Sequence, residues 1–207
     1  MNIRNHRLKQ QVSFIVEVDK LKSVLRQSYI ADASRHENSA EHCWHLATMA
    51  LILAEYSPVP LDVLHVTKML LIHDIVEVDA GDTSVYNIEA VENQSESELL
   101  AANRIFSLLP TDQFEELRQI WIEFENAKTP EAKFAKVLDR LMPLLHNYLT
   151  QGRRWREGGI VYEQVMAINK PIREGSPELW QFAMSIIEEC VARGYLHKGI
   201  KSTRKSA

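Results

Sequence analysis

The sequence predicts a single all-α domain, and three observations support this fold class. Glycine and proline, the strongest breakers of regular structure, occur only seven times each in 207 residues, and several of them cluster. The long stretches between the clusters repeat apolar residues at helical spacing, and no segment alternates convincingly at the period of a strand. No internal repeat or low-complexity linker divides the chain, which is long enough to bury a core of its own.

Three helices are expected in the first part of the chain. The first spans about residues 7–27, and a polar loop over residues 32–38 separates it from the second, residues 39–56, with the serine at its start as the expected cap. The third begins near Leu61, is apolar almost all round, as buried central helices are, and ends at Gly81-Asp82-Thr83-Ser84. The residues of the first helix expected to face inward are Val12, Ile15, Val16, Val18, Leu21 and Leu25.

Five further helices are expected in the second part. A glutamate-rich helix covers about residues 89–109 and ends at a proline, and the next carries the apolar residues of 111–124. The Thr-Pro-Glu start of residues 129–148 is a good helix N-terminus, because proline suits the first helical position. A short helix near 160–170 and a last one near 177–194 complete the fold.

The composition limits the classes of function. The net charge is −4 with no broad basic excess, which argues against a protein that binds the nucleic-acid backbone. The N-terminus is polar and no apolar run reaches about 18 residues, so no secretory or membrane signal is expected and the protein is predicted to be soluble and cytoplasmic. Cys43 and Cys190 are expected to be reduced, buried thiols. Residues 1–197 are expected to form the domain, and residues 198–207 a disordered basic tail.

A histidine and an aspartate stand side by side in the apolar run Leu70–Glu77. Burying an imidazole and a carboxylate among aliphatic side chains costs several kcal/mol unless each finds a partner, and one metal ion would partner both. Glu77 lies four residues after His73 and three after Asp74, so on a helix all three crowd toward one side. The run alone leaves open a hydrogen-bonded His–Asp pair that only supports the core.

Further ligands are expected on other apolar helices. Asp139 lies where its neighbours favour burial, although a surface pair with Arg140 or Lys136 is the alternative. His42 and His45 are three residues apart and share a helix face, and their spacing does not choose between them.

Two imidazoles and two carboxylates together suit one divalent ion such as Mn²⁺, Co²⁺, Fe²⁺, Zn²⁺ or Mg²⁺. The sequence contains no CxxC, HExxH, GxxxxGK[ST] or GxGxxG pattern. These absences argue against a zinc knot, a zincin, a P-loop NTPase and a dinucleotide enzyme.

The order of these motifs resembles the HD-domain metal-dependent phosphohydrolases, and most closely the branch of bacterial 5′-deoxynucleotidases and their eukaryotic HD-domain relatives. The resemblance spans about residues 15–150 and is carried by Glu37–His42, His73–Glu77, Gly81-Asp82 and Lys136–Asp139. It implies an HD-domain helical bundle, a homodimer and a divalent metal cofactor. It also implies that His42, not His45, is the first ligand, in the set His42, His73, Asp74 and Asp139.

The resemblance also implies roles for residues around the metal. Glu77 positions or deprotonates the attacking water, and Asp82 touches the sugar or the leaving group. An arginine upstream of the first ligand holds the phosphate: Arg26 fits best and Arg35 competes. Some relatives place an aromatic residue directly after that arginine, whereas this chain has Gln27.

Other polar and aromatic residues carry weaker signals. Thr83 and Ser84 offer hydroxyl donors to a substrate, or only form the turn. The arginines of the Gly152–Gly159 loop either attract anionic substrate at the pocket mouth or, the favoured interpretation, belong to a solvated loop or a subunit contact. The tryptophans at helix-period positions are expected in the core or at a dimer interface: Trp44, Trp121 and Trp180.

The sequence therefore predicts a metal-dependent phosphomonoesterase for nucleoside 5′-monophosphates, with deoxynucleotides favoured and no nucleic-acid or membrane partner. Two alternatives remain at this point. One is an HD hydrolase of another phosphate ester or of a nucleoside triphosphate, which should need more basic residues near the metal. The other is a non-catalytic helical module that keeps the metal for stability, for which neither Glu77 nor Asp82 would be needed.

Overall fold

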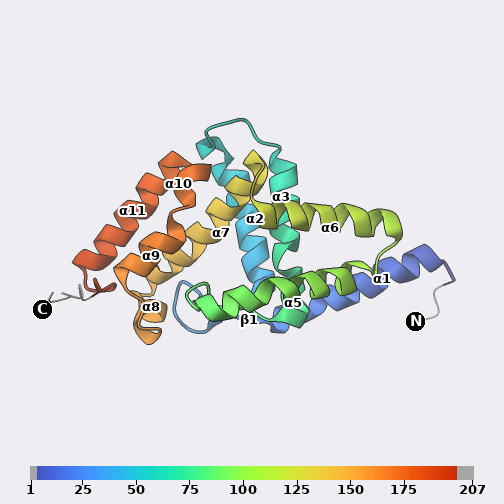
Figure 1. Cartoon of the computed structure of the whole chain (residues 1–207), viewed down its shortest axis with the longest axis horizontal. Coiled ribbons are helices and arrows are strands. Elements are labelled where there is room, and N and C mark those ends of the chain that lie inside the picture. The colour runs from blue at the N-terminus through green and yellow to red at the C-terminus, as the bar shows by residue number, and fades with distance from the viewer. Residues whose placement is uncertain (1–3, 200–207) are drawn as a thin grey trace, which may run out of the picture.

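The computed structural model describes residues 4–199, without the side chains of residues 88–93. The chain folds into helices with one small sheet, which confirms the predicted all-α class (Figure 1). The first half contains α1 (His6–Val18), the 3₁₀ helix η1 (Asp19–Ser23), β1 (Leu25–Tyr29), β2 (His36–Asn38), α2 (Ser39–Leu53), η2 (Ala54–Tyr56), α3 (Val63–Ile72), η3 (His73–Val76) and α4 (Glu77–Ala80). The second half contains α5 (Ile88–Phe106), α6 (Thr111–Asn126), α7 (Pro130–Leu149), α8 (Arg153–Glu157), α9 (Tyr162–Asn169), α10 (Ile172–Gly175) and α11 (Pro177–Ala192).

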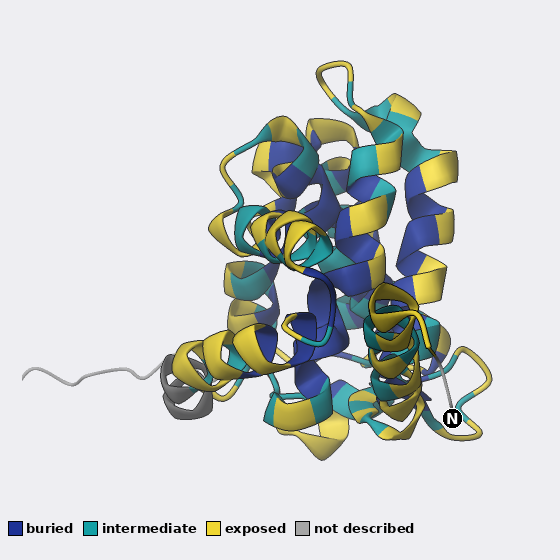
Figure 2. Ribbon diagram, turned by 90° about the vertical axis from the view of Figure 1, so that its right-hand side faces the viewer, coloured by how far each residue is buried: buried dark blue, intermediate teal, exposed yellow. Residues whose placement is uncertain are grey.

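Helices α2, α3 and α7 pack against one another in the middle of the molecule. In Figure 1, α1, α5 and α6 lie to one side of them and α8 to α11 to the other. Buried residues gather on the inward faces of the helices in Figure 2, and each large apolar side chain buried there contributes about 1.5–3 kcal/mol. The two cysteines, Cys43 and Cys190, are buried in this core as free thiols, as predicted.

The predicted first helix is wrong beyond residue 18. Helix α1 ends at Val18, and after a short 3₁₀ helix the chain forms β1, which pairs antiparallel with β2 so that Leu25 lies opposite Asn38. Strands of five and three residues are too short to show period-two alternation, and pairing with a distant segment outweighs local helix propensity. The sheet brings Arg26 and Glu37 onto adjacent strands.

Several apolar residues expected in the core are exposed instead. Leu21, one of the residues expected to face inward, is buried. On α1 and α3, however, neighbouring elements cover only one face of each helix, and apolar residues on the other face stay exposed. Apolar composition alone does not tell which face of a helix is covered, because apolar residues are common on protein surfaces. The exposed residues are Ile15, Val16, Leu25, Leu64 and Leu71.

The predicted third helix is interrupted at the His73-Asp74 pair. Helix α3 ends at Ile72, and His73 opens the 3₁₀ helix η3 before α4 begins at Glu77. Because a 3₁₀ helix has three residues per turn, Asp74 and Glu77 point to the same side. Helix α4 then ends at Gly81, whose φ of 73° is a conformation that residues with a side chain rarely adopt.

The start of α2 is capped by Asn38, not by Ser39 as expected. The Asn38 side chain accepts the backbone N–H of Glu41, and the Glu41 side chain accepts the backbone N–H of Asn38. This capping box leaves the Ser39 hydroxyl available for the site described below.

Two further expectations concern segments that follow α7. The predicted loop between Gly152 and Gly159 contains helix α8. Most of the predicted disordered tail, residues 200–207, lies outside the described residues, whereas the backbone N–H of Gly199 donates to Glu163. Among the described residues, no helix is both long enough and apolar enough to cross a membrane.

Candidate metal centre and substrate pocket

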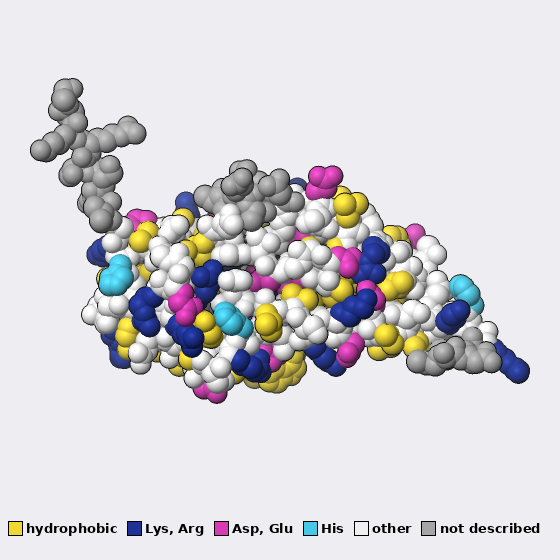
Figure 3. Space-filling model, turned by 90° about the horizontal axis from the view of Figure 1, so that it is seen from below, with side chains coloured by type: hydrophobic (Ala, Val, Ile, Leu, Met, Phe, Trp, Pro, Cys, Tyr) yellow, Lys and Arg dark blue, Asp and Glu magenta, His cyan; other side chains and the backbone are white. Residues whose placement is uncertain are grey.

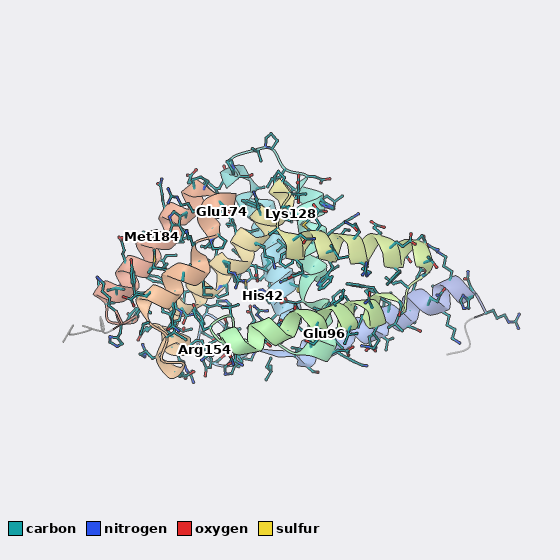
Figure 4. All side chains as sticks on the ribbon, in the orientation of Figure 1. His42, Glu96, Lys128, Arg154, Glu174 and Met184 are labelled. Atoms are coloured by element: carbon teal, nitrogen blue, oxygen red, sulfur yellow. The ribbon has the colours of Figure 1, made fainter. Side chains whose placement is uncertain are left out.

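The four predicted metal ligands come from three elements and meet at the centre of the molecule, where Figure 4 labels His42. Helix α2 carries His42, η3 carries His73 and Asp74, and α7 carries Asp139. Nε2 of His42 lies 3.2 Å from Oδ1 of Asp139 and 3.8 Å from Oδ2 of Asp74. Nε2 of His73 lies 3.0 Å from Oδ1 of Asp74 and 3.7 Å from Oδ1 of Asp139. Two imidazoles and two carboxylates thus present their atoms to one small volume.

The orientation of the two imidazoles fits a bound cation. Nδ1 of His73 lies 3.0 Å from the Leu70 carbonyl oxygen and donates to it, so that Nε2 is the ring nitrogen that faces the cluster. This Nε2 is buried and has no hydrogen bond to the described residues, which costs about 1–3 kcal/mol. Nδ1 of His42 faces Oε2 of Glu37 at 3.4 Å, the carboxylate–imidazole arrangement common behind metal ligands. The four residues therefore fit a divalent cation.

Asp139 is held in its ionised form by this cluster. Burial raises the pKa of the Asp139 carboxyl, but the His42 and His73 imidazoles outweigh burial and hold that pKa well below its usual range. The alternative surface pair is not formed with Lys136, which instead contacts Glu125 at 3.1 Å. The carboxylate is thus charged and directed inward, as a cation ligand must be.

His45 does not join the four ligands. Its side chain is exposed, and the residues whose possible ligand atoms lie near it are Glu37 and His146. Of the two histidines that spacing left open, the structure brings His42 to the cluster.

Arg26 lies among four carboxylates, and its side chain is only 12 % exposed. Its Nη1 lies 2.6 Å from Oδ2 of Asp74, 3.7 Å from Glu77 and 3.9 Å from Asp82. Its Nε lies 3.6 Å from Oε2 of Glu37. Burial lowers the pKa of Arg26, but the carboxylates, Asp74 foremost, outweigh burial and raise that pKa above its usual range. One guanidinium therefore offsets much of the negative charge of the site.

Arg35, the competitor of Arg26, lies elsewhere. Its side chain is 54 % exposed and forms a bidentate pair with Glu41 at 2.5 and 2.9 Å. It does not line the pocket beside the cluster. Of the two arginines, Arg26 is the one within reach of a phosphate there.

Glu77 and Asp82 lie beside the four ligands, and both carboxyl groups have raised pKa values. Burial, and then the charge of Asp74, raises the pKa of Glu77 to about 9, while Oε2 of Glu77 accepts the Ser39 hydroxyl at 2.5 Å. Burial raises the pKa of Asp82, whose Oδ2 accepts the backbone N–H of Gln27 at 3.0 Å. Ser39 was expected only as a cap, and its contact with Glu77 follows from a pairing that sequence spacing does not reveal.

A pocket of about 310 Å³ opens beside the cluster and is lined by Arg26, Asp82 and Thr83, among others. Two further arginines line it: Arg140 follows Asp139 on α7, and Arg154 lies on α8, where Figure 4 labels it. Neither forms an ion pair with the described residues. For Arg154 the structure therefore favours the alternative interpretation, a position at the pocket, over a solvated loop.

Glu98 of α5 lines the same pocket, and its raised pKa predicts that the stability of the fold depends on pH. Burial, and then the nearby Glu125, raises the pKa of Glu98 from 4.5 to about 7. Between pH 4.5 and about pH 7, the folded protein therefore binds more protons at Glu98 than the unfolded chain does. The contribution of Glu98 to the free energy of unfolding is therefore complete below about pH 4.5 and is lost as the pH rises through 7. Thermal unfolding of chelated protein at pH 5 and pH 8 checks it. Glu98→Gln should gain stability relative to the unsubstituted chain at pH 8, and an equal difference at both pH values would contradict it.

A family model described as HD domain matches residues 18–180, most of the chain. The chain belongs to the HD-domain family. The match begins at the last residue of α1 and includes all four predicted ligands together with Glu77 and Asp82.

Relatives with functional names are found at moderate identity. The human 5′-deoxynucleotidase HDDC2 is 29 % identical over 141 residues, 68 % of either chain. The 5′-deoxynucleotidase hdd1 of Schizosaccharomyces pombe is 25 % identical over 134 residues, which cover 62 % of this chain and 66 % of that protein. These alignments span about two thirds of the relatives' length.

Solved structures share the fold. A predicted metal-dependent phosphohydrolase from Magnetospirillum magnetotacticum MS-1 is 47 % identical, with a TM-score of 0.88 over 93 % of this chain and 100 % of that one. The PH0347 protein of Pyrococcus horikoshii OT3, 23 % identical with a TM-score of 0.63, shares the fold alone. The family model, the enzyme relatives and the Magnetospirillum structure together identify this HD-domain protein as a phosphohydrolase that uses a divalent metal, not a non-catalytic module.

Proposed function

We propose that the protein removes the 5′-phosphate of nucleoside 5′-monophosphates, with deoxynucleotides as the favoured class, in a reaction that depends on one divalent ion held by His42, His73, Asp74 and Asp139. The observation that carries this proposal is the meeting of the four ligands with Glu77 and Asp82 at the wall of one pocket. The names of the human and yeast relatives support the nucleotide substrate.

The bound ion would supply Lewis acidity toward a phosphoryl oxygen, lower the pKa of water and favour the ionised form of Glu77. Arg26 stabilises the charge of the phosphoryl oxygens, because its guanidinium is within hydrogen-bond reach of the ligand Asp74 and lines the pocket. Burial of Arg26 strengthens this attraction, since charges shielded from water are screened weakly.

Glu77 and Asp82 divide the proton transfers in this proposal. Ionised Glu77 orients the attacking water and accepts its proton, while the Ser39 hydroxyl fixes the carboxylate through Oε2. Asp82, whose pKa is raised by burial, carries the proton that the leaving 5′-oxygen needs. Phosphate and the nucleoside are the products.

The experiment that tests the substrate class is phosphate release from a panel of ribo- and deoxynucleoside 5′-monophosphates at saturating Mn²⁺ or Co²⁺. We expect turnover of the monophosphates with a preference for the deoxy sugar, and the Asp82→Asn variant should lose turnover of every member. A folded, metal-loaded protein that releases phosphate from none of them would contradict the proposal.

Arg140 and Arg154 favour a second candidate, hydrolysis of a nucleoside di- or triphosphate. A site for further phosphates needs extra basic residues, and these two guanidinium groups line the pocket without an ion pair to the described residues. Extending the panel to di- and triphosphates separates the candidates. The second is favoured if Arg140→Ala and Arg154→Ala raise the KM of the longer phosphates more than that of the monophosphates.

We also propose that the protein is a homodimer, and exposed apolar side chains on α2 support this. Trp44, expected in the core or at an interface, is 65 % exposed, so the core alternative is wrong. Leu51 lies two helical turns further along the same face and is 65 % exposed. Charges at these positions would be desolvated in an interface, so Trp44→Glu with Leu51→Glu should give monomers by light scattering. The matched variant Leu149→Glu on α7 should leave the dimer intact. Equal masses for the unsubstituted chain, the double variant on α2 and Leu149→Glu would contradict the assignment of this α2 face to a dimer interface.

The remaining expectations on partners and location stay proposals. The described side chains in Figure 3 intersperse lysine and arginine with aspartate and glutamate and form no broad basic patch on that face. This mixture supports a small-molecule substrate over a nucleic acid. A cytoplasmic location remains a prediction from the sequence.

A further inference from the structure

A second group of potential metal ligands lies behind the predicted centre. It consists of Glu37 on β2, His45 on α2 and His146 on α7, whose possible ligand atoms all lie within 4.8 Å of one another. The roles proposed above use none of these three as a ligand. Glu37 and His146 are 2 % and 5 % exposed, whereas His45 is exposed and gives the group access to solvent.

The buried members of this group lack hydrogen bonds. Oε2 of Glu37 and Nδ1 of His146 are both buried without a hydrogen-bond partner among the described residues, and they lie 3.9 Å apart. Burying such groups unsatisfied costs about 1–3 kcal/mol each. A distance of 3.9 Å is too long for a hydrogen bond and is a few tenths of an ångström more than the roughly 3.3–3.6 Å between two ligands that each lie about 2.0–2.2 Å from a tetrahedral cation, so a small side-chain shift would let both bind one ion.

We propose that Glu37, His45 and His146 bind a second divalent transition-metal ion. Two imidazoles and one carboxylate form a donor set typical of Zn²⁺, Co²⁺ and Fe²⁺, and solvent at His45 supplies the remaining ligands. The guanidinium of Arg26 lies 3.6 Å from Oε2 of Glu37 and repels a cation there, so we expect this site to bind more weakly than the first.

The second site adjoins the first through one side chain. Oε2 of Glu37 lies 3.4 Å from Nδ1 of His42, whose other ring nitrogen faces the predicted metal centre. The two ions would therefore lie on opposite sides of the His42 ring. The proposal rests on the Glu37, His45 and His146 side chains and does not depend on the substrate of the enzyme.

Metal stoichiometry of the full chain tests this inference. The protein is stripped with a chelator and dialysed to equilibrium against a saturating concentration of Zn²⁺ or Co²⁺, and the bound metal is measured by mass spectrometry as the excess over the dialysis buffer. The variants are His45→Ala, Asp74→Ala and, as a matched control, His65→Ala, because His65 is a histidine paired with a carboxylate, Glu123, away from both sites. His45→Ala changes an exposed side chain, so the fold should persist.

We expect two ions in the unsubstituted chain and in His65→Ala, and one in His45→Ala. Asp74→Ala should keep one ion, with a visible Co²⁺ spectrum that disappears when His45→Ala is added. One ion in the unsubstituted chain, or two in His45→Ala, would overturn the inference and leave a water-bridged cluster. If His42, His73, Asp74 and Asp139 do not bind an ion, Asp74→Ala would instead bind as many ions as the unsubstituted chain.

Discussion

Replacing Asp74 by alanine should abolish both tight binding of the first metal ion and turnover. Asp74 places Oδ1 at 3.0 Å from His73 and Oδ2 at 2.6 Å from Arg26, so its loss would remove a proposed metal ligand and also release the arginine proposed to bind phosphate. Lewis acidity contributes several kcal/mol, and about 1.4 kcal/mol is tenfold in rate, so we expect kcat/KM to fall by roughly 10³-fold or more. Phosphate release and Mn²⁺ binding by calorimetry measure the two losses.

The matched control for this variant is Asp79→Ala. Asp79 lies five residues further on, on α4, and pairs with Arg104 at the surface, away from the ligands. It should keep metal affinity and turnover, with a stability change of about 1 kcal/mol or less. Full activity in Asp74→Ala would show that the cluster is not the catalytic centre.

Replacing Arg26 by alanine should have the second largest effect, and on stability as well as on turnover. The variant leaves Glu37, Asp74, Glu77 and Asp82 buried without their shared cation, and loss of one partner from a buried charge cluster costs about 3–5 kcal/mol. A divalent ion at the first centre compensates part of this repulsion. We therefore expect a large fall in the free energy of unfolding in chelator and a smaller one in Mn²⁺, measured by urea denaturation under both conditions.

Arg35→Ala provides the comparison, because Arg35 forms an exposed pair with Glu41 outside the pocket. It should lower the free energy of unfolding by about 1 kcal/mol or less, with no dependence on metal. Equal losses for the two arginine variants in chelator would contradict the electrostatic role assigned to Arg26.

The residues of the candidate metal centre could be singled out from the sequence because they break a strong pattern. His73 and Asp74 interrupt an apolar run, and Asp139 lies among residues that favour burial, so burial itself marked them as candidates. The fold class was equally accessible, since long helix-period segments dominate the chain. The choice of His42 over His45 was not available from spacing, because both share one helix face, and it came from the resemblance.

The residues around the ligands depend on tertiary contacts that the sequence does not display. Glu37 lies in a polar segment that looks solvated, and only pairing of β1 with β2 and packing on α2 bury it. Arg154 reaches the pocket because α8 packs against β1 and α7. Ser39 contacts Glu77 because the 3₁₀ turn at His73 redirects the chain, a backbone change that apolar periodicity cannot reveal.

The most direct measurement of the central claim is phosphate release from a deoxynucleoside 5′-monophosphate by protein stripped of metal, before and after addition of Mn²⁺, Co²⁺, Mg²⁺ or Zn²⁺ separately. The account predicts no release from the stripped protein and recovery with at least one ion, in proportion to occupancy of the site formed by His42, His73, Asp74 and Asp139. Undiminished release by the stripped protein, or silence of the folded protein with every ion, would contradict it.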